Sequence, residues 1–134
     1  MSQENVEIVR QGWDAWASGD LDALFALLAE DVVFDMSHLG DWPEPTYTGY
    51  VGVQRFLTEW LEVWSEFEVG VDEFVAARDG RVVVLFWQRG LGRRSGLPME
   101  VEWAQIVTVR DDKAARVSFY DHRQEALKAA GLGE

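Results

Sequence analysis

The chain has 134 residues, of which 48% are hydrophobic and 27% are charged, values typical of one globular domain over residues 1–134. The net charge of −12 argues against binding to nucleic acid or to an anionic membrane, because both are negatively charged. The absence of cysteine excludes disulfides, thiol catalysis and thiolate metal sites. There is no apolar segment that matches a signal peptide or a membrane span, so we expect a cytoplasmic protein.

Two helices are predicted in the first thirty residues. Val6, Val9, Trp13 and Trp16 recur at helical spacing and predict one buried stripe on a helix that continues to Ser18. A second helix is expected over residues 21–29, with an N-cap from the preceding aspartate. A turn at 30–31, a short strand at 32–35, a long loop at 36–49 and a third helix at 51–67 follow.

The second half of the chain changes to the alternating pattern of strands. Strands are expected at residues 68–77, 82–88, 99–109 and 114–120, and a last short helix at 122–130. Helices followed by a run of antiparallel strands predict an α+β fold. We therefore expect a curved antiparallel sheet with the three N-terminal helices packed on one face, where they enclose a cone-shaped cavity.

The two strands at residues 82–88 and 99–109 are the strongest strand signals in the chain. In the second of these strands, Gln105 stands between Trp103 and Val107 on a mostly apolar face. A single amide among apolar side chains suggests the wall of a pocket. The first strand is apolar on both faces, whereas helices can cover only one, so we also expect a homodimer through the sheet.

Four stretches resemble one protein family. They are VRQGWDAWASGDLDALFALLAEDVVFD, YTGYVGVQRFLTEWLE, DGRVVVLFWQRGLGRRSG and YDHRQEALKAAGL. Together they resemble SnoaL-like proteins, which are related to ketosteroid isomerase in the nuclear-transport-factor-2-like superfamily. The resemblance implies a cone-shaped α+β fold that is commonly dimeric. It leaves the activity open, because this superfamily contains isomerases, cyclases, hydrolases and non-catalytic binding modules.

The resemblance also implies roles for particular residues. Asp35 matches the general base of ketosteroid isomerase, and Gln105 stands where that enzyme has a protonated aspartate. The tyrosine of the first helix has no counterpart at Gly12 or Trp13. An amide can still donate a hydrogen bond to an oxyanion, but steroid isomerisation is not expected.

Two polar candidates have a structural alternative. Asp35 is either a base in an apolar pocket, with a pKa raised by burial, or a loop-capping residue that accepts from the amide of Ser37 or His38. His38 is either an acid–base partner of Asp35 or an exposed loop residue. No HxH or HxxxH spacing occurs, so neither a metal nor another cofactor is expected.

The aromatic residues are candidate contacts for a ligand, with packing in the core or at a dimer interface as the alternative. Trp103 is the best candidate because it neighbours Gln105, and the Tyr120 hydroxyl could donate to a ligand. The substrate-binding candidates are Trp13, Trp16, Phe56, Trp60, Trp87, Trp103 and Tyr120.

Three functions fit these patterns. The first is an isomerase, cyclase or hydrolase that performs acid–base chemistry on a small hydrophobic substrate through Asp35, His38 and Gln105. The second is a module that binds a small hydrophobic molecule without changing it. The third is a dimerisation domain whose cavity is filled by its own tryptophans.

Overall fold

The computed structural model describes residues 2–133 as four helices and six strands, an α+β fold as the sequence predicted. None of these helices is long and apolar enough to cross a membrane. The elements are α1 (Ser2–Ser18), α2 (Leu21–Ala26), β1 (Leu28–His38), β2 (Thr46–Thr48), α3 (Gly49–Val63), β3 (Trp64–Ala76), β4 (Val82–Gly92), β5 (Pro98–Arg110), β6 (Lys113–Tyr120) and α4 (Arg123–Ala129).

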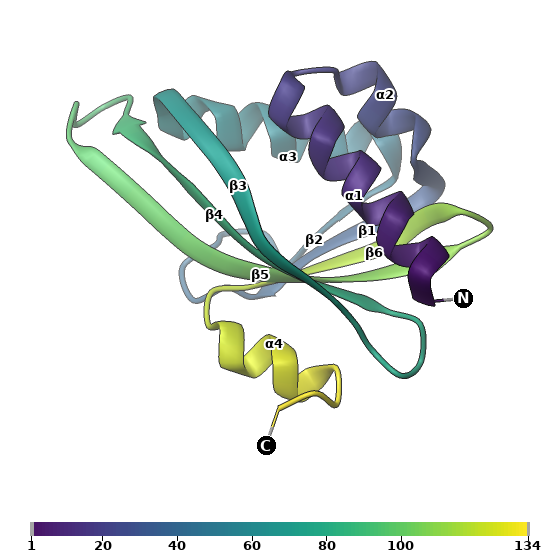
Figure 1. Ribbon diagram of the computed structural model, residues 1–134. Helices are drawn as coiled ribbons and strands as arrows, with labels where there is room; N and C mark the ends of the chain where they lie inside the picture. Colours follow the sequence, from purple (N-terminus) through teal and green to yellow (C-terminus); the bar gives the residue numbers. More distant parts are fainter. Residues whose placement is uncertain (1, 134) are drawn as a thin grey trace.

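The six strands form one curved, unclosed sheet in the order β2-β1-β6-β5-β4-β3. Strands β3 to β6 are a continuous antiparallel meander, as predicted. Strand β1 joins this meander in parallel beside β6, and β2 pairs antiparallel with β1 at the edge. Helices α1, α2 and α3 lie on one side of the sheet and α4 lies on the other (Figure 1).

The alternation of β4 divides its side chains between two apolar clusters. Val82, Val84 and Phe86 belong to the main core, which lies between the sheet and α1–α3. Val83 faces the other way and packs with Ala126 of α4. We call these two sides of the sheet the inner face and the outer face. Because α4 covers part of the outer face, an apolar side chain there does not by itself require a partner subunit.

The region around the first strand differs most from the sequence prediction. Helix α2 ends at Ala26, and residues 30–31 lie inside β1 instead of forming a turn. The register of β1 against β6 shifts between Leu28 and Val33, so an irregular strand absorbs these residues. Strand β2, which the sequence placed in a loop, is held by its pairing with β1.

Helix α3 ends four residues earlier than predicted. Trp64 is four residues after Trp60 and so continues the helical pattern, but its backbone is extended (ψ 136°). The side chain of Trp64 is buried and contacts Trp60 edge to face at 5.6 Å. Trp64 pairs with Gly92, the last residue of β4. This strand pairing therefore outweighs the helical periodicity at Trp64.

Candidate functional site

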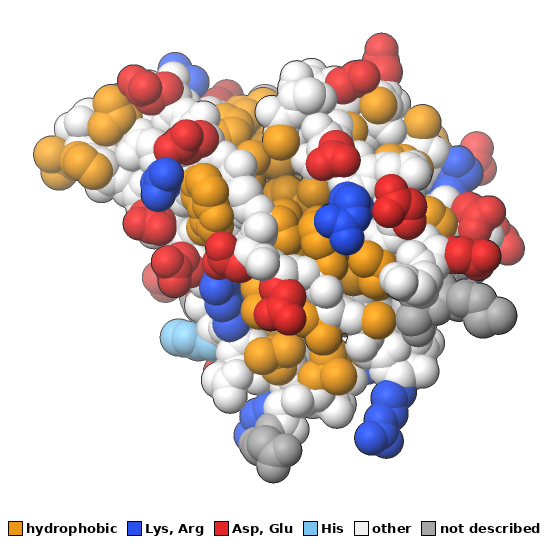
Figure 2. Space-filling view, viewed as in Figure 1, with side chains coloured by type: hydrophobic (Ala, Val, Ile, Leu, Met, Phe, Trp, Pro, Cys, Tyr) orange, Lys and Arg blue, Asp and Glu red, His pale blue; other side chains and the backbone are white. Residues whose placement is uncertain are grey.

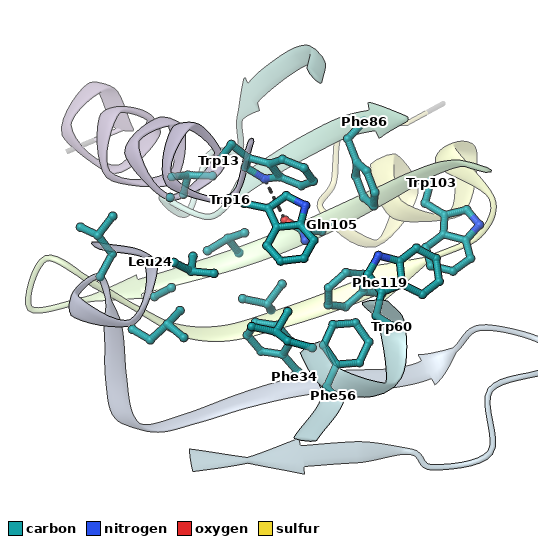
Figure 3. Close-up of a pocket in the computed structure, with 18 of the residues that line it drawn as sticks. Trp13, Trp16, Leu24, Phe34, Phe56, Trp60, Phe86, Trp103, Gln105 and Phe119 are labelled. Carbon is teal, nitrogen blue, oxygen red and sulfur yellow. Dashed lines mark hydrogen bonds between the residues drawn. The ribbon is translucent and has the colours of Figure 1, made fainter. Parts of the chain in front are cut away.

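An apolar pocket of about 100 Å³ lies between the inner face of the sheet and helices α1–α3 (Figure 3). On the face shown in Figure 2, apolar side chains gather in the middle and acidic side chains surround them. The pocket is lined by Ile8, Val9, Gly12, Trp13, Trp16, Leu24, Leu27, Leu28, Phe34, Phe56, Leu57, Trp60, Phe86, Gln88, Trp103, Gln105, Val107, Ala114, Val117 and Phe119.

Eight aromatic residues line the pocket, and several of their rings pack against one another. Trp13 lies 4.7 Å from Phe86, and Trp60 lies 5.3 Å from Trp103, between ring centroids. Phe56 contacts Phe119 at 5.6 Å. These contacts come from α1, α3 and three strands, so the rings themselves occupy much of the space that the cone encloses.

Gln105 holds α1 against β5. The Trp13 indole Nε1–H donates to Gln105 Oε1 at 3.2 Å, as the dashed line in Figure 3 marks. This donor fixes which end of the amide is the carbonyl.

Gln88 makes the equivalent link to α3. The Trp60 indole Nε1–H donates to Gln88 Oε1 at 3.1 Å, and Gln88 is only 1% exposed. Its Nε2 group is buried and lacks a partner within the described chain. Among the described residues, Gln88 and Gln105 are the only polar side chains in the lining besides the indole N–H groups.

The structure brings six of the ten predicted site residues to the pocket wall. They are Trp13, Trp16, Phe56, Trp60, Trp103 and Gln105. The other four, Asp35, His38, Trp87 and Tyr120, are not part of the lining. On β1 the apolar neighbours Phe34 and Met36 belong to the inner core, so the alternation turns Asp35 to the outer face.

Asp35 is a buried, ion-paired carboxylate on that outer face. Arg116 Nη2 donates to Asp35 Oδ2 at 2.8 Å, and the Ser37 backbone N–H donates to Oδ1 at 2.9 Å. Burial opposes the ionisation of Asp35, but the hydrogen bonds from Ser37 and Arg116 outweigh it and lower the pKa. The expected rise in pKa is therefore wrong, and the capping contact with Ser37 is present.

His38 and Tyr120 form a stacked pair beside Asp35. Their ring centroids lie 4.2 Å apart at 9°, and His38 Nε2 lies 3.8 Å from Asp35 Oδ2. Burial raises the pKa of the Tyr120 hydroxyl, and the charge of Asp35 adds to this effect. Neither ring reaches the pocket, because β6 directs Phe119 inward and Tyr120 outward.

Trp87 packs on the outer face over a glycine. A Cβ on Gly70, which pairs with Trp87 across the strands, would come within 2.4 Å of the indole ring. The Arg89 guanidinium lies 4.6 Å from the same ring. Trp87 is therefore held between Gly70 and Arg89 and does not contact the pocket.

Gln88 is the polar pocket residue that the sequence analysis missed, and the aromatic residues Phe34, Phe86 and Phe119 were also not predicted as site residues. The signal for Gln88 was present, because this residue follows Val82, Val84 and Phe86 in the same alternating set, as Gln105 follows Trp103. No group of three or more His, Asp or Glu side chains in the described chain is arranged to hold a metal.

A curved sheet and three helices around an apolar pocket are the cone fold of the nuclear-transport-factor-2-like (NTF2-like) class. The family model of the SnoaL-like domain matches residues 9–117. The chain therefore belongs to the SnoaL-like domain family. No curated protein matches it by sequence.

One similar crystal structure supports this assignment, and two others share the fold. An NTF2-like protein from Burkholderia xenovorans LB400 is 30% identical over 90% of both chains, with a TM-score of 0.72. TerC, co-crystallized with polyporic acid, is 21% identical over 96% of this chain and 98% of its own (TM-score 0.76). A protein with a ketosteroid isomerase-like fold from Catenulispora acidiphila DSM 44928, in complex with trimethylamine, is 21% identical over 94% and 93% (TM-score 0.70). The last two likenesses show the fold alone.

Proposed function

We propose that this protein binds a small, uncharged, apolar molecule in the pocket between the inner face of the sheet and α1–α3. The observation that carries the proposal is the chemistry of the wall. Eight of its side chains are aromatic, two are glutamines, and no Asp, Glu, His, Lys, Arg or Tyr of the described chain lines it. Aromatic walls favour a flat apolar ligand, because stacked and edge-to-face contacts add to the burial of apolar surface.

The same wall favours binding over proton transfer. Amide and indole groups do not exchange protons with a substrate near neutral pH, whereas general acid–base catalysis needs a titratable group within hydrogen-bond reach. The carboxylate expected to act as the base, Asp35, instead pairs with Arg116 on the outer face. Gln105 could stabilise an oxyanion, but no base accompanies it in the lining.

The size of the pocket limits the ligand. Sites for drug-sized ligands occupy roughly 300–1,000 Å³, whereas this pocket has about 100 Å³. A molecule of about one ring fits this space, and a larger one requires an aromatic side chain to move. Among proteins of this fold, TerC was crystallized with polyporic acid and another with trimethylamine, so ligands of different size are compatible with the architecture.

Indole N–H signals provide a direct test. Trp13 and Trp60 each donate into the pocket wall, so their N–H resonances in an isotope-labelled sample should shift during a titration with acetophenone. Trp→Phe variants assign the signals. The ligand should be recovered unchanged at the end of the titration, since the proposal includes no reaction.

Two variants control the location of binding. Ala114→Leu places a larger side chain in the pocket and should weaken binding strongly, whereas Asp35→Asn on the outer face should leave the affinity unchanged. Equal binding by Ala114→Leu and the unmodified protein would place the ligand elsewhere. Consumption of the ligand that stops in Asp35→Asn would support the enzymatic alternative.

The homodimer and the cytoplasmic location predicted from the sequence also stay proposals. Cell fractionation tests the location.

A further inference from the structure

The buried amide of Gln88 is a hydrogen-bond donor without an acceptor. Its Oε1 accepts from Trp60, and its Nε2 has no partner among the described residues although the side chain is only 1% exposed. A buried donor left unpaired is unfavourable and is uncommon in folded proteins. Gln88 also lines the pocket, so a ligand that reaches its amide would supply the missing acceptor.

A second glutamine, Gln105, lies at the other end of the wall, but of these two amides only that of Gln88 is a buried donor without a partner in the described chain. Gln88 pairs with Val101 and Gln105 pairs with Val84, so the two glutamines are four residues apart along the strands. Four residues span roughly 13 Å of strand. The Phe86–Trp103 pair lies between them on the inner face. The wall thus has an amide at each end and aromatic rings in the middle.

The pocket wall offers a ligand more hydrogen-bond donors than free acceptors. Both glutamine carbonyls already accept a bond from an indole N–H, whereas the buried Nε2 group of Gln88 has no partner among residues 2–133. The indole groups of Trp16 and Trp103 add only donors. A ligand that carries an acceptor oxygen therefore satisfies the wall better than one that carries only donors or no polar atom.

The charge of the protein disfavours an anionic acceptor. No lysine or arginine lines the pocket in the described chain, and the net charge of the molecule is −12. An anion would be buried without a counter-charge, at a much larger cost than a neutral carbonyl or ether oxygen. The acceptor is consequently expected to be uncharged.

We propose that Gln88 is the specificity-determining residue of the pocket, and that its Nε2 group selects uncharged ligands with a hydrogen-bond-accepting oxygen. This inference rests on the proposed function, since it requires the pocket to bind a small molecule. It adds the chemistry by which one ligand is preferred over another of the same shape.

Two probes of nearly equal shape test the selection. Acetophenone carries a carbonyl oxygen where α-methylstyrene carries a methylene group. The unmodified protein should bind acetophenone roughly tenfold more tightly, the effect expected when a buried donor gains a partner. Benzoate, which has the same ring and a negative charge, should bind more weakly than acetophenone.

Substitution of the amide should remove the preference. Gln88→Met keeps the length of the side chain and removes the Nε2 donor, so the two affinities should become nearly equal. The ratio of affinities is the informative quantity, because a general loss of packing would weaken both probes alike. Gln54→Met on the exposed side of α3 is the matched control and should keep the full ratio.

A vibrational measurement gives an independent readout. The carbonyl stretching band of bound acetophenone should lie at lower frequency in the unmodified protein than in Gln88→Met, because a hydrogen bond weakens the C=O bond. If Gln88→Met does not fold, the preference of the unmodified protein for acetophenone still tests the inference, and Gln105→Met should keep that preference.

The outcomes separate the two proposals. Equal binding of both probes by the unmodified protein would overturn the role of Gln88 and leave ligand binding intact. A preference that persists in Gln88→Met with an unshifted carbonyl band would also overturn it. Binding of neither probe would overturn both proposals.

Discussion

The Asp35 carboxylate lies between two donors, the Arg116 guanidinium and the Ser37 backbone N–H. Asp35→Asn keeps an acceptor for Ser37 but removes the charge that pairs with Arg116. Arg116 is about half exposed, with 48% of its side chain accessible, so solvent screens this ion pair. We expect the substitution to lower the free energy of unfolding near neutral pH by about 1 kcal/mol.

The effect of Asp35→Asn should depend on pH with a defined sign. The pKa of Asp35 in the folded protein is below its ordinary value of 3.8. The charged form therefore adds stability that is fully present above that ordinary value and is lost as the pH falls through the folded pKa. Urea unfolding of both proteins near neutral pH and at about pH 3 should show the difference shrinking in acid. Asp14→Asn, on the exposed side of α1, is the control, and a difference that grows in acid would contradict the assignment.

The alternation of side chains along a strand was enough to predict which face of the sheet a site residue occupies. Phe34 and Met36 are the apolar set of β1, and this set by itself directs Asp35 outward, as the structure finds. The resemblance to ketosteroid isomerase instead led to a base in the pocket. Gln88 was missed for a different reason, because a polar residue at the end of an apolar strand resembles a strand terminus until its burial is known.

At the scale of elements, one hydrogen bond ties α1 to the sheet. Trp13→Phe keeps an aromatic ring against Phe86 but removes the N–H that donates to Gln105. The Gln105 carbonyl would then be left unpaired in an apolar wall, so we expect the free energy of unfolding to fall by about 1–2 kcal/mol. Urea unfolding measures this change. Trp16→Phe makes the same replacement on the same helix, at an indole that does not bond to Gln105. An equal loss of unfolding free energy in both variants would show that packing alone is responsible.

The tight turn between β5 and β6 holds two aspartates in a backbone conformation that is unfavourable for residues other than glycine. Asp111 and Asp112 both have positive φ, 53° and 63°, the left-handed conformation of a two-residue hairpin turn. Asp112→Gly should stabilise the protein by about 0.5 kcal/mol, because glycine adopts this conformation without steric strain. Thermal unfolding should show a small rise in Tm. Asp112→Ala is the opposite control and should lower the Tm.

The sequence predicted which helices and strands exist better than it predicted where they end and which strands pair. The β3–β6 meander was predictable because long alternating strands and short polar turns are local signals. The place of β1 beside β6 was not, since this parallel pairing joins residues far apart in the chain. Helix α3 shows the same limit, because Trp64 fits a helical pattern and only the pairing with β4 makes it extended.

At the scale of the whole molecule, the outer face determines whether a homodimer forms. The sequence argument for a dimer relied on an uncovered apolar face, and α4 covers the part of that face around Val83 and Ile106. What stays accessible is the neighbouring part of the sheet, where half-buried Trp87 lies beside exposed Glu102. A dimer through the sheet would therefore have to include Trp87.

The size of such an interface can be judged against the surface of one subunit. Stable interfaces bury about 800 Å² on each partner, whereas the accessible surface of the described chain is 7560 Å². About a tenth of the surface would be needed, which is more than one indole supplies. The interface would have to extend from Trp87 over the adjoining strands β3 and β5.

We predict that sedimentation analysis at micromolar concentration shows a dimer, and that Trp87→Ala shifts it toward monomer. The reason is that large aromatic side chains near the centre of an interface contribute most of its binding energy. Removing Trp87 also uncovers Gly70, so a circular dichroism spectrum must first show that the variant keeps its strands. Leu97→Ala is the matched control, because Leu97 is 64% exposed in the hairpin between β4 and β5. An unmodified protein that sediments as a monomer would refute the dimer and leave the contact of Trp87 with Gly70 and Arg89 of its own chain as the only role of this ring among the described residues.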